Sequence, residues 1–557
     1  MNPTGLFKQI SVKLPGFAGN IGVVLLLTGL FLLAELYLHW VGRIDGILWR
    51  KDDVGYILAF FLFMRLVAVP GRAWLTVLFL MQLLQLSEIG YFLFAGSYFG
   101  PADLVLLSRQ YKDFWGSLSE VAILFLAPAL LILISAGISL FVLKRSTGLN
   151  FQLGPRSGNA LLILWLTIPF IHAYTEDNSM RFDPDPGKTA FRNGINAFSY
   201  HLVWDLLLNQ RGAAGVLYPD YILSRAVDPV IEQPLNLVVI MGESITHTHM
   251  GLYGYERDTT PFLSAMEREG RLIFRPGISS AVSTHVSIPM FFNIQYEPDN
   301  RTHIASGETN LYRLAKSKGY QTAFLSSQEM YAIASQVSKG SVDIWKEFEH
   351  IEGLPEEFDG KLIATLKSLP FDWDRPFLLT LNPRAGHIPY AKYTPEEFVS
   401  FGKGLSRSEY HRYMQSTYDD AMRYFDHVVS EIVDVLRQHV KNPTVVIITS
   451  DHGQRLGEST GYGHNTLEFG SARVPFIYLG LNTPLAVNAL VGGLDCPVTH
   501  YDVGRFIARL LGYLVRSSSE TENTYFINGV DLTGRGGYLR YTRSEANEGL
   551  DCIQQGL

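Results

Sequence analysis

Cysteine is scarce in this chain, and its scarcity excludes two kinds of architecture. The 557 residues include two cysteines, Cys496 and Cys552. Two thiols cannot form a scaffold of several disulfides, and thiols so far apart lack the short spacing of a thiolate zinc site. The sequence leaves open whether the two cysteines pair with each other, which would require an oxidising compartment.

Charge is also sparse, and the basic residues are scattered. Asp, Glu, Lys and Arg make up 18% of the chain, whereas soluble domains have about 25%. The 46 Lys and Arg residues are outnumbered by 53 Asp and Glu residues, and they form no basic run. Because a protein that binds nucleic acid through phosphates needs clustered basic side chains, we expect no nucleic-acid partner.

The missing charge is concentrated in the N-terminal third of the chain. A helix of about 20 apolar residues crosses the hydrocarbon core of a bilayer. Buried helices of a soluble core are the alternative, but so many apolar segments would leave no polar face for water. We therefore predict five transmembrane helices, two of them short, over residues 21–40, 54–69, 73–94, 121–143 and 160–174.

An odd number of spans places the two ends of the chain on opposite sides of the membrane. The Lys and Arg residues of the connecting loops favour a cytoplasmic N-terminus by a narrow margin. On this topology the large C-terminal part lies outside the cytoplasm. We predict a transmembrane domain over 1–175, a linker and interfacial connector over 176–234, and a further domain over 235–557.

Beyond residue 235 the pattern is that of an α/β domain. Apolar, β-branched segments alternate with helical stretches, such as 311–318 and 408–438. Continuous apolar strands separated by helices predict a mainly parallel sheet that is covered by helices on both faces. The predicted strands are Asn236–Met241, Gln321–Ser326, Phe377–Leu381, Thr444–Thr449 and Pro475–Gly480.

Polar side chains follow these strands at the points where they end. Glu243 comes directly after the first strand, and Asp451 and His452 come directly after the fourth. Ligands of open parallel sheets bind at the carboxyl edge, where such side chains meet. Together with the hydroxyl of Thr284, these residues could hold one divalent cation.

Each of these residues also has a simpler interpretation when it is taken alone. Glu243 could stabilise the N-terminus of a helix, and the Thr284 hydroxyl could bond to the backbone of its own loop. His387 and His464 could be ordinary packed or solvated histidines. Several separate segments that all offer ligand-type side chains at one sheet edge favour a functional site instead.

Three motifs resemble those of the membrane-bound phosphoethanolamine transferases, a family of the alkaline-phosphatase and sulfatase-like superfamily. The turn Gly242–Ser244 precedes the segment Tyr253–Thr259, which reads YGYERDT. The segment Thr284–Pro289 is similar to the family's nucleophile motif, and Ser450–Glu458 is similar to its metal-binding motif. The predicted N-terminal spans extend the resemblance over nearly the whole chain.

The resemblance implies a fold and a set of roles. It implies a five-helix transmembrane domain followed by an α/β alkaline-phosphatase-like catalytic domain in the periplasm of a bacterium, anchored in the inner membrane. Glu243, Asp451 and His452 would bind Zn²⁺, with Mn²⁺ as the alternative, together with Thr284 as ligand and nucleophile. His387 and His464 would be further catalytic residues.

The resemblance also implies a donor and an acceptor. The donor would be phosphatidylethanolamine, and the acceptor an envelope glycan or lipopolysaccharide. Lys339 and Gln328 are candidates for binding the substrate phosphate, because the loop before Lys339 departs from the family pattern and Gln328 could take part of that role. Glu35 and Glu88 are ionisable residues in predicted spans and therefore candidates for attracting the ethanolammonium group.

Three other functions were compared with this prediction. A phosphoglycerol transferase of the lipoteichoic-acid-synthase type has the same metal ligands and five spans, but Tyr253–Thr259 favours ethanolamine. A sulfatase would need a modified Cys or Ser in a context that Thr284 lacks. A non-enzymatic envelope sensor with a degenerate domain would be expected to have lost one of the metal-binding residues, and none is lost.

Overall fold

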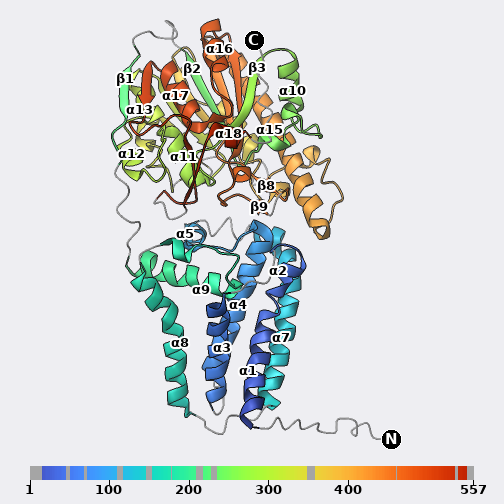
Figure 1. Ribbon diagram of the computed structural model, residues 1–557. Coiled ribbons are helices and arrows are strands. Elements are labelled where there is room, and N and C mark those ends of the chain that lie inside the picture. The colour runs from blue at the N-terminus through green and yellow to red at the C-terminus, as the bar shows by residue number, and fades with distance from the viewer. Residues whose placement is uncertain are drawn as a thin grey trace. The chain divides into compact units, whose positions relative to one another are not determined.

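The chain forms two compact units in the computed structural model (Figure 1). The first comprises residues 1–108 and 121–211, and the second comprises residues 109–120 and 212–557. Each unit is described separately. The described residues are 16–44, 50–67, 72–109, 117–145, 153–176, 179–208, 218–226, 235–330, 332–347, 358–458, 461–532 and 537–547.

The described residues of the first unit are almost entirely helical. Apolar side chains such as Leu27, Phe60, Trp74 and Trp165 form its core. The elements are α1 (Gly16–Leu32), α2 (Leu36–Trp40), α3 (Lys51–Leu66), α4 (Arg72–Ala95), α5 (Pro101–Arg109), η1 (Ala122–Phe125), α7 (Leu126–Arg145), α8 (Pro155–Thr175), η2 (Ser179–Phe182), α9 (Ala190–Tyr200) and η3 (His201–Leu207).

Among the described residues of this part of the chain, three helices are long and apolar enough to cross a membrane, namely Arg72–Ala95, Ser117–Arg145 and Pro155–Thr175. They match three of the five predicted spans. The first predicted span, 21–40, is divided between α1 and α2 by a turn that ends at Glu35. Its apolar part, Asn20–Leu32, is a shorter helix, and the helix of the second span, α3, has 16 residues.

The second unit is built around an eight-stranded sheet with the order β11-β3-β10-β7-β2-β6-β4-β5. The central strands β7, β2, β6 and β4 run parallel to one another. The strands are β2 (Asn236–Gly242), β3 (Leu272–Ile278), β4 (Gln321–Ser326), β5 (Ile344–Lys346), β6 (Phe377–Asn382), β7 (Thr444–Ser450), β10 (Arg473–Leu481) and β11 (Val498–Thr499).

Both faces of the sheet are buried, which explains the continuous apolar strands. Leu237 and Val239 of β2 pack into a core that also contains Phe292 and Ile507 from helices on one face. On the other face, a Cβ atom added at Gly242 would lie 3.2 Å from the Phe425 ring of helix α15 (Tyr410–His439). The prediction of helices on both faces of the sheet is therefore confirmed.

Strand β10 differs from its neighbours, because it runs antiparallel to both β7 and β3. The described residues between β7 and β10, 451–458 and 461–472, contain the short 3-10 helix η12 (Phe469–Ser471) but no crossover helix. A strand that follows without such a crossover returns in the opposite direction. Because β3 is antiparallel to β10, it runs in the same direction as β7, and β10 alone among the eight strands runs against the others. The sheet is therefore mixed, but it is mainly parallel, as predicted.

Helices and short strands complete the described part of the second unit. The predicted helices 311–318 and 408–438 correspond to α13 and α15. The helices are α10 (Pro261–Arg268), α11 (Thr284–Phe292), α12 (Arg301–Ser306), α13 (Leu311–Ser317), α14 (Phe358–Lys367), α15 (Tyr410–His439), α16 (Leu485–Gly492), α17 (His500–Leu510) and α18 (Arg543–Ala546). The short strands are β1 (Ile222–Arg225), β8 (Arg455–Leu456), β9 (Tyr462–Gly463), β12 (Tyr513–Arg516), β13 (Tyr525–Asn528) and β14 (Tyr538–Tyr541).

The YGYERDT segment is fixed to α15 by buried carboxylates. Asp419 accepts hydrogen bonds from Tyr255 at 3.0 Å and from Arg257 at 2.7 Å. About two turns further along α15, Asp426 accepts hydrogen bonds from the backbone N–H groups of Phe262 and Leu263 at 2.7 and 3.0 Å. Asp426 therefore caps the N-terminus of α10, whose own N-cap residue offers no side-chain bond.

Replacing Asp426 with alanine should destabilise the second unit. The change leaves two backbone N–H groups without their acceptor at a site where Asp426 is 1% exposed. We expect the free energy of unfolding to fall by about 2 kcal/mol. Urea unfolding followed by tryptophan fluorescence measures this change.

Asp434→Ala is the matched control on the same helix. Its side chain is 53% exposed and pairs with Arg437, so we expect a change within about 0.5 kcal/mol. Equal losses in the two variants would contradict a capping role for Asp426.

Candidate metal centre and nucleophile

The turn after β2 places Glu243 at the carboxyl edge of the sheet. Ser244 adopts the left-handed backbone region, with φ 58°, a strained conformation that surrounding contacts must hold. Its backbone N–H donates to Asp451 at 3.0 Å, and its hydroxyl donates to Glu243 at 2.9 Å. Ser244 therefore donates one hydrogen bond to each of the two carboxylates and links them.

Asp451 and His452 reach the same edge from β7, the neighbour of β2. The register pairs Gly242 with Ser450, so both strands end at the same level. The Nδ1 atom of His452 lies 3.0 Å from the carbonyl oxygen of Gly453. A carbonyl can only accept, so Nδ1 carries a proton, and Nε2 is the ring nitrogen that faces the two carboxylates.

Thr284 is the first residue of α11, and its hydroxyl lies between these three side chains. The Oγ1 atom is 2.7 Å from Asp451 Oδ2, 3.4 Å from Glu243 Oε2 and 3.1 Å from His452 Nε2. The predicted metal ligands and the predicted nucleophile therefore meet at one point, although they come from three separate segments.

The residues of this cluster fit a divalent cation. One ligand atom each from Glu243, Asp451 and His452 lies within 4.8 Å of the others, and all three residues are buried. Burial raises the pKa of Glu243, and the neighbouring Asp451 carboxylate raises it further. Two carboxylates in a buried site need a positive charge, and carboxylate, imidazole and hydroxyl ligands together suit zinc.

His464 lies directly against the cluster. Its ring centroid is 4.0 Å from that of His452, and its Nδ1 atom is 3.1 Å from Gln454 Oε1. Burial lowers the pKa of His464 well below its usual value, and the neighbouring His452 and His387 lower it further. His464 is therefore a neutral imidazole that lies beside His452, whose Nε2 atom contacts the Thr284 hydroxyl.

His387 follows β6 and also belongs to this neighbourhood. Its ring meets Tyr393 edge-on at 5.9 Å between centroids. A positive charge on His387 would lower the pKa of Glu243 and that of His464, so its ring lies near both. The structure thus brings both predicted histidines to the carboxyl edge of the sheet.

The two candidates for binding the substrate phosphate are placed differently. The Gln328 amide donates to Glu243 at 2.9 Å and to Asn382 at 3.1 Å, so it lies beside the cluster. The Lys339 ammonium lies 3.4 Å from Glu347 and over the Trp345 ring at 5.3 Å. A direct contact with the cluster's ligands is therefore established for Gln328.

Asn382 is a residue of this site that the sequence analysis did not single out. It ends β6, donates to the Met241 carbonyl at 2.7 Å and accepts from Ser326 at 2.7 Å. It therefore orients Gln328, which in turn donates to Glu243. Its position at the end of a predicted strand was the signal that could have identified it.

The two predicted carboxylates of the first unit bond to the protein backbone. Glu35 accepts from the N–H of Ala190 at 2.9 Å and from the Gln85 amide at 3.0 Å. Glu88 accepts from the N–H of Phe99 at 3.0 Å. Glu35 thus supports the N-terminus of α9, and a role for either carboxylate in binding ethanolammonium stays a prediction.

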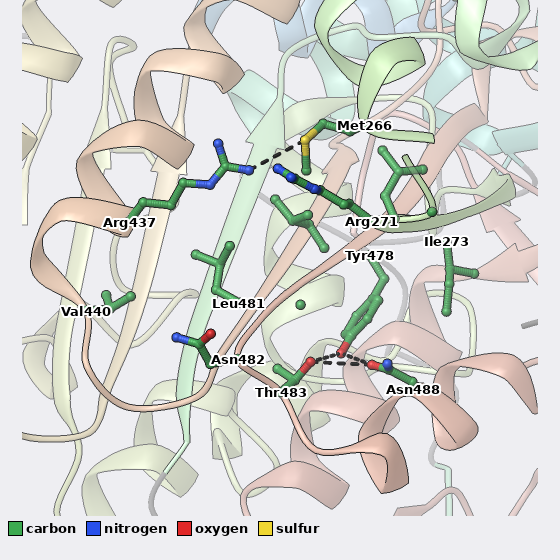
Figure 2. A pocket seen from close by; sticks show the side chains of 14 residues that line it. Met266, Arg271, Ile273, Arg437, Val440, Tyr478, Leu481, Asn482, Thr483 and Asn488 are labelled. Carbon is green, nitrogen blue, oxygen red and sulfur yellow. Dashed lines mark hydrogen bonds between the residues drawn. The ribbon is translucent and has the colours of Figure 1, made fainter. Parts of the chain in front are cut away.

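A separate pocket of about 430 Å³ lies at the opposite edge of the sheet (Figure 2). It is lined by residues at the start of β3 and the end of β10, such as Arg271, Tyr478 and Asn482. Leu481 of β10 pairs with Thr444, the first residue of β7, whereas the metal cluster follows the last residue of β7. The pocket therefore does not contain the predicted site residues.

Replacing Asp451 with asparagine should weaken metal binding. Asparagine keeps an oxygen for the N–H groups of Ser244 and His452 but removes the negative charge that faces Thr284. Because loss of an indirect partner alone costs about 10–100-fold in affinity, we expect a loss of at least about 100-fold for a direct ligand. Competition with a chromophoric chelator for zinc on the purified full chain measures this affinity.

Glu269→Gln is the control for this measurement, because Glu269 is an exposed acid paired with Arg271 away from the cluster. It should bind zinc as tightly as the wild type. Unchanged zinc affinity in Asp451→Asn would rule out this cluster as the metal centre.

Comparison with known proteins places this geometry among known folds. The family model for sulfatases matches residues 235–513, half of the chain. Among solved structures, the integral membrane protein lipooligosaccharide phosphoethanolamine transferase A (EptA) from Neisseria meningitidis is similar with a TM-score of 0.54 and 17% identity. The match covers 90% of this chain and 96% of that one, which shows a shared fold.

Two curated relatives are similar over part of their sequences. The Kdo(2)-lipid A phosphoethanolamine 7''-transferase of Escherichia coli is 26% identical over 239 residues, which cover 40% of this chain and 39% of the relative. The phosphatidylethanolamine transferase Mcr-1 of Escherichia coli is 25% identical over 262 residues, with coverage of 43% and 46%. The chain thus matches less than half the length of each relative.

Proposed function

The chain belongs to the sulfatase family, whose fold is alkaline-phosphatase-like, and from this premise we propose that it is a phosphoethanolamine transferase of the bacterial envelope. In this proposal it moves phosphoethanolamine from phosphatidylethanolamine to an envelope glycan or lipopolysaccharide. The observation that carries the proposal is the Thr284 hydroxyl, which contacts Glu243, Asp451 and His452 at once.

The nucleophile in the proposed reaction is Thr284 Oγ1. It attacks the phosphorus of the donor, the bond from phosphorus to the diacylglycerol oxygen breaks, and a phosphoethanolamine ester forms on the threonine. An acceptor hydroxyl or phosphate then attacks the same phosphorus and restores the free threonine. Zinc, or manganese as the alternative, would supply positive charge at Glu243, Asp451 and His452 that lowers the pKa of a bound hydroxyl.

Proton transfer is the proposed work of the two histidines. A neutral imidazole can accept the proton of the attacking hydroxyl and return it to the departing diacylglycerol oxygen. The place of His464 beside His452 supports this role. We assign the same function to His387, which follows β6 and lies near Glu243 and His464.

Binding of the substrate phosphate is assigned to Gln328, with Lys339 as the second candidate. The Gln328 amide lies within hydrogen-bond distance of Glu243, so a small movement would let it donate to a phosphoryl oxygen. The N-terminus of α11, at Thr284, would add to this binding, because the N-terminus of a helix favours anions.

The apolar helices of the first unit support the assignment to the inner membrane. Three of them are long enough to cross a bilayer, and we propose five spans with the catalytic unit in the periplasm. Cys496 is disulfide-bonded, a state that persists in oxidising compartments such as the periplasm. A membrane anchor would keep the enzyme at the surface that contains its lipid donor.

Intact-protein mass spectrometry tests the covalent step. After incubation with phosphatidylethanolamine, the wild type should gain the mass of one phosphoethanolamine, and Thr284→Ala should gain none. Transfer activity of the alanine variant should fall by at least about 1,000-fold, as expected for loss of a nucleophile. The neighbouring Ser283→Ala, which leaves the Thr284 hydroxyl in place, should still form the adduct.

Other outcomes of the same experiment are equally informative. A phosphoglycerol adduct after incubation with phosphatidylglycerol, without one from phosphatidylethanolamine, would support the lipoteichoic-acid-synthase type of reaction. An adduct that persists in Thr284→Ala would assign the nucleophile to another residue.

Fusion of a periplasm-dependent reporter enzyme to the C-terminus tests the topology. We expect an active alkaline-phosphatase reporter, because that enzyme needs the oxidising periplasm to form its disulfides. A β-galactosidase fusion at the same position is the control and should be inactive. The reverse pattern in well-expressed fusions would place the second unit in the cytoplasm.

A further inference from the structure

His249 is a buried histidine outside the metal cluster, and a carboxylate faces each of its ring nitrogens. It belongs to the short helix η4 (His247–His249), just beyond the Glu243 turn. Its Nδ1 atom is 2.8 Å from Asp419 Oδ1, and its Nε2 atom is 2.7 Å from Glu458 Oε1. An ionised carboxylate can only accept, so both nitrogens must donate, and the ring is an imidazolium.

The surroundings of His249 favour this charged form. Burial lowers the pKa of His249, but the bonds to Asp419 and Glu458 outweigh burial and raise it above the usual value. The pKa of Glu458 is lowered, mainly because the bond to His249 overcomes its own burial. The titratable and charged groups that face the ring from the elements packed against it are Asp419 and Tyr418 of α15, Glu458 after β8, and Tyr255 and Arg257.

The two carboxylates differ in how firmly they are held. Asp419 is fully buried and also accepts from Tyr255 and Arg257. The Glu458 side chain is 50% exposed, and its second oxygen accepts from the backbone N–H of Leu456. If the imidazolium lost its proton, Asp419 would keep its other donors, so the bond to Glu458 is the one that would break.

Glu458 belongs to the segment that leads to His464. Strands β8 and β9 form an antiparallel pair in which Leu456 lies opposite Tyr462 and Arg455 lies opposite Gly463. His464 follows β9 directly. A contact that fixes Glu458 therefore also restrains the hairpin from which His464 projects toward His452.

We propose that His249 is a positioning residue for the transfer reaction, in which its imidazolium ties the β8–β9 hairpin, and through it His464, to η4 and α15. The proposal rests on the proposed function, because it assigns His464 a part in catalysis. The sign of the pH effect follows from the raised pKa: the tie is complete below the ordinary pKa of a histidine and is lost as the pH rises through the raised value.

Glu458→Gln tests the tie with little change in shape. Glutamine can still accept a hydrogen bond from His249 but lacks the charge that stabilises the imidazolium. In the purified full chain, we expect the alkaline limb of the transfer rate to move down by about one pH unit, which lowers the rate about tenfold on that limb. On the acid side of this limb the rate should stay within about twofold of the wild type, because His249 is protonated in both proteins there.

Glu468→Gln is the matched control, since Glu468 pairs with Arg455 of the same hairpin but does not contact His249. Its pH profile should coincide with that of the wild type. A purely structural role for Glu458 would lower the rate by the same factor at every pH, and that result, or a profile identical to the wild type, would overturn the proposal.

Hydrogen exchange separates this proposal from the proposed function. The peptide that spans β8, β9 and His464 should lose protection at a lower pH in Glu458→Gln than in the wild type, after correction for the intrinsic exchange rate. This measurement needs no substrate, so it tests the tie even if the wild type proves to lack transferase activity. Equal protection in both proteins from pH 6 to 9 would contradict the tie.

Discussion

Two carboxylates held side by side in a buried site are the constraint on which the rest of this centre depends. Glu243 and Asp451 are 1% and 0% exposed, and like charges so placed repel each other strongly. The protein supplies partial compensation through donors: the Ser244 N–H to Asp451 and the Gln328 amide to Glu243. The remaining deficit of positive charge is what makes the cluster a candidate metal centre.

The sheet fixes the positions of the two carboxylates relative to each other. Strands β2 and β7 are parallel neighbours whose last residues, Gly242 and Ser450, lie opposite each other. The residues that follow them must therefore emerge together, and the left-handed turn at Ser244 directs Glu243 toward Asp451. Helix α11 then begins at Thr284 and adds the hydroxyl to the pair of carboxylates.

Around this centre, the YGYERDT segment has a structural role. Its Tyr255 and Arg257 side chains donate to Asp419, and the hydroxyl of Tyr253 donates to backbone carbonyls of β3 and β10. These contacts hold the turn region after β2 against α15. The segment therefore supports the site from outside: in these contacts its side chains bond to Asp419 and to the backbone, and not to the metal-binding residues.

The sequence by itself determined the strands that carry the site and most of its ligands. Apolar strands that are buried on both faces have a distinct local pattern, and Glu243, Asp451 and His452 follow them immediately, so a shared sheet edge predicts their meeting. Tertiary structure alone decided the direction of β10, the division of the first predicted span at Glu35, and the pairing of Gln328 rather than Lys339 with Glu243. The reason is that strand direction and long-range partners depend on how distant segments pack, which the local periodicity of a sequence does not encode.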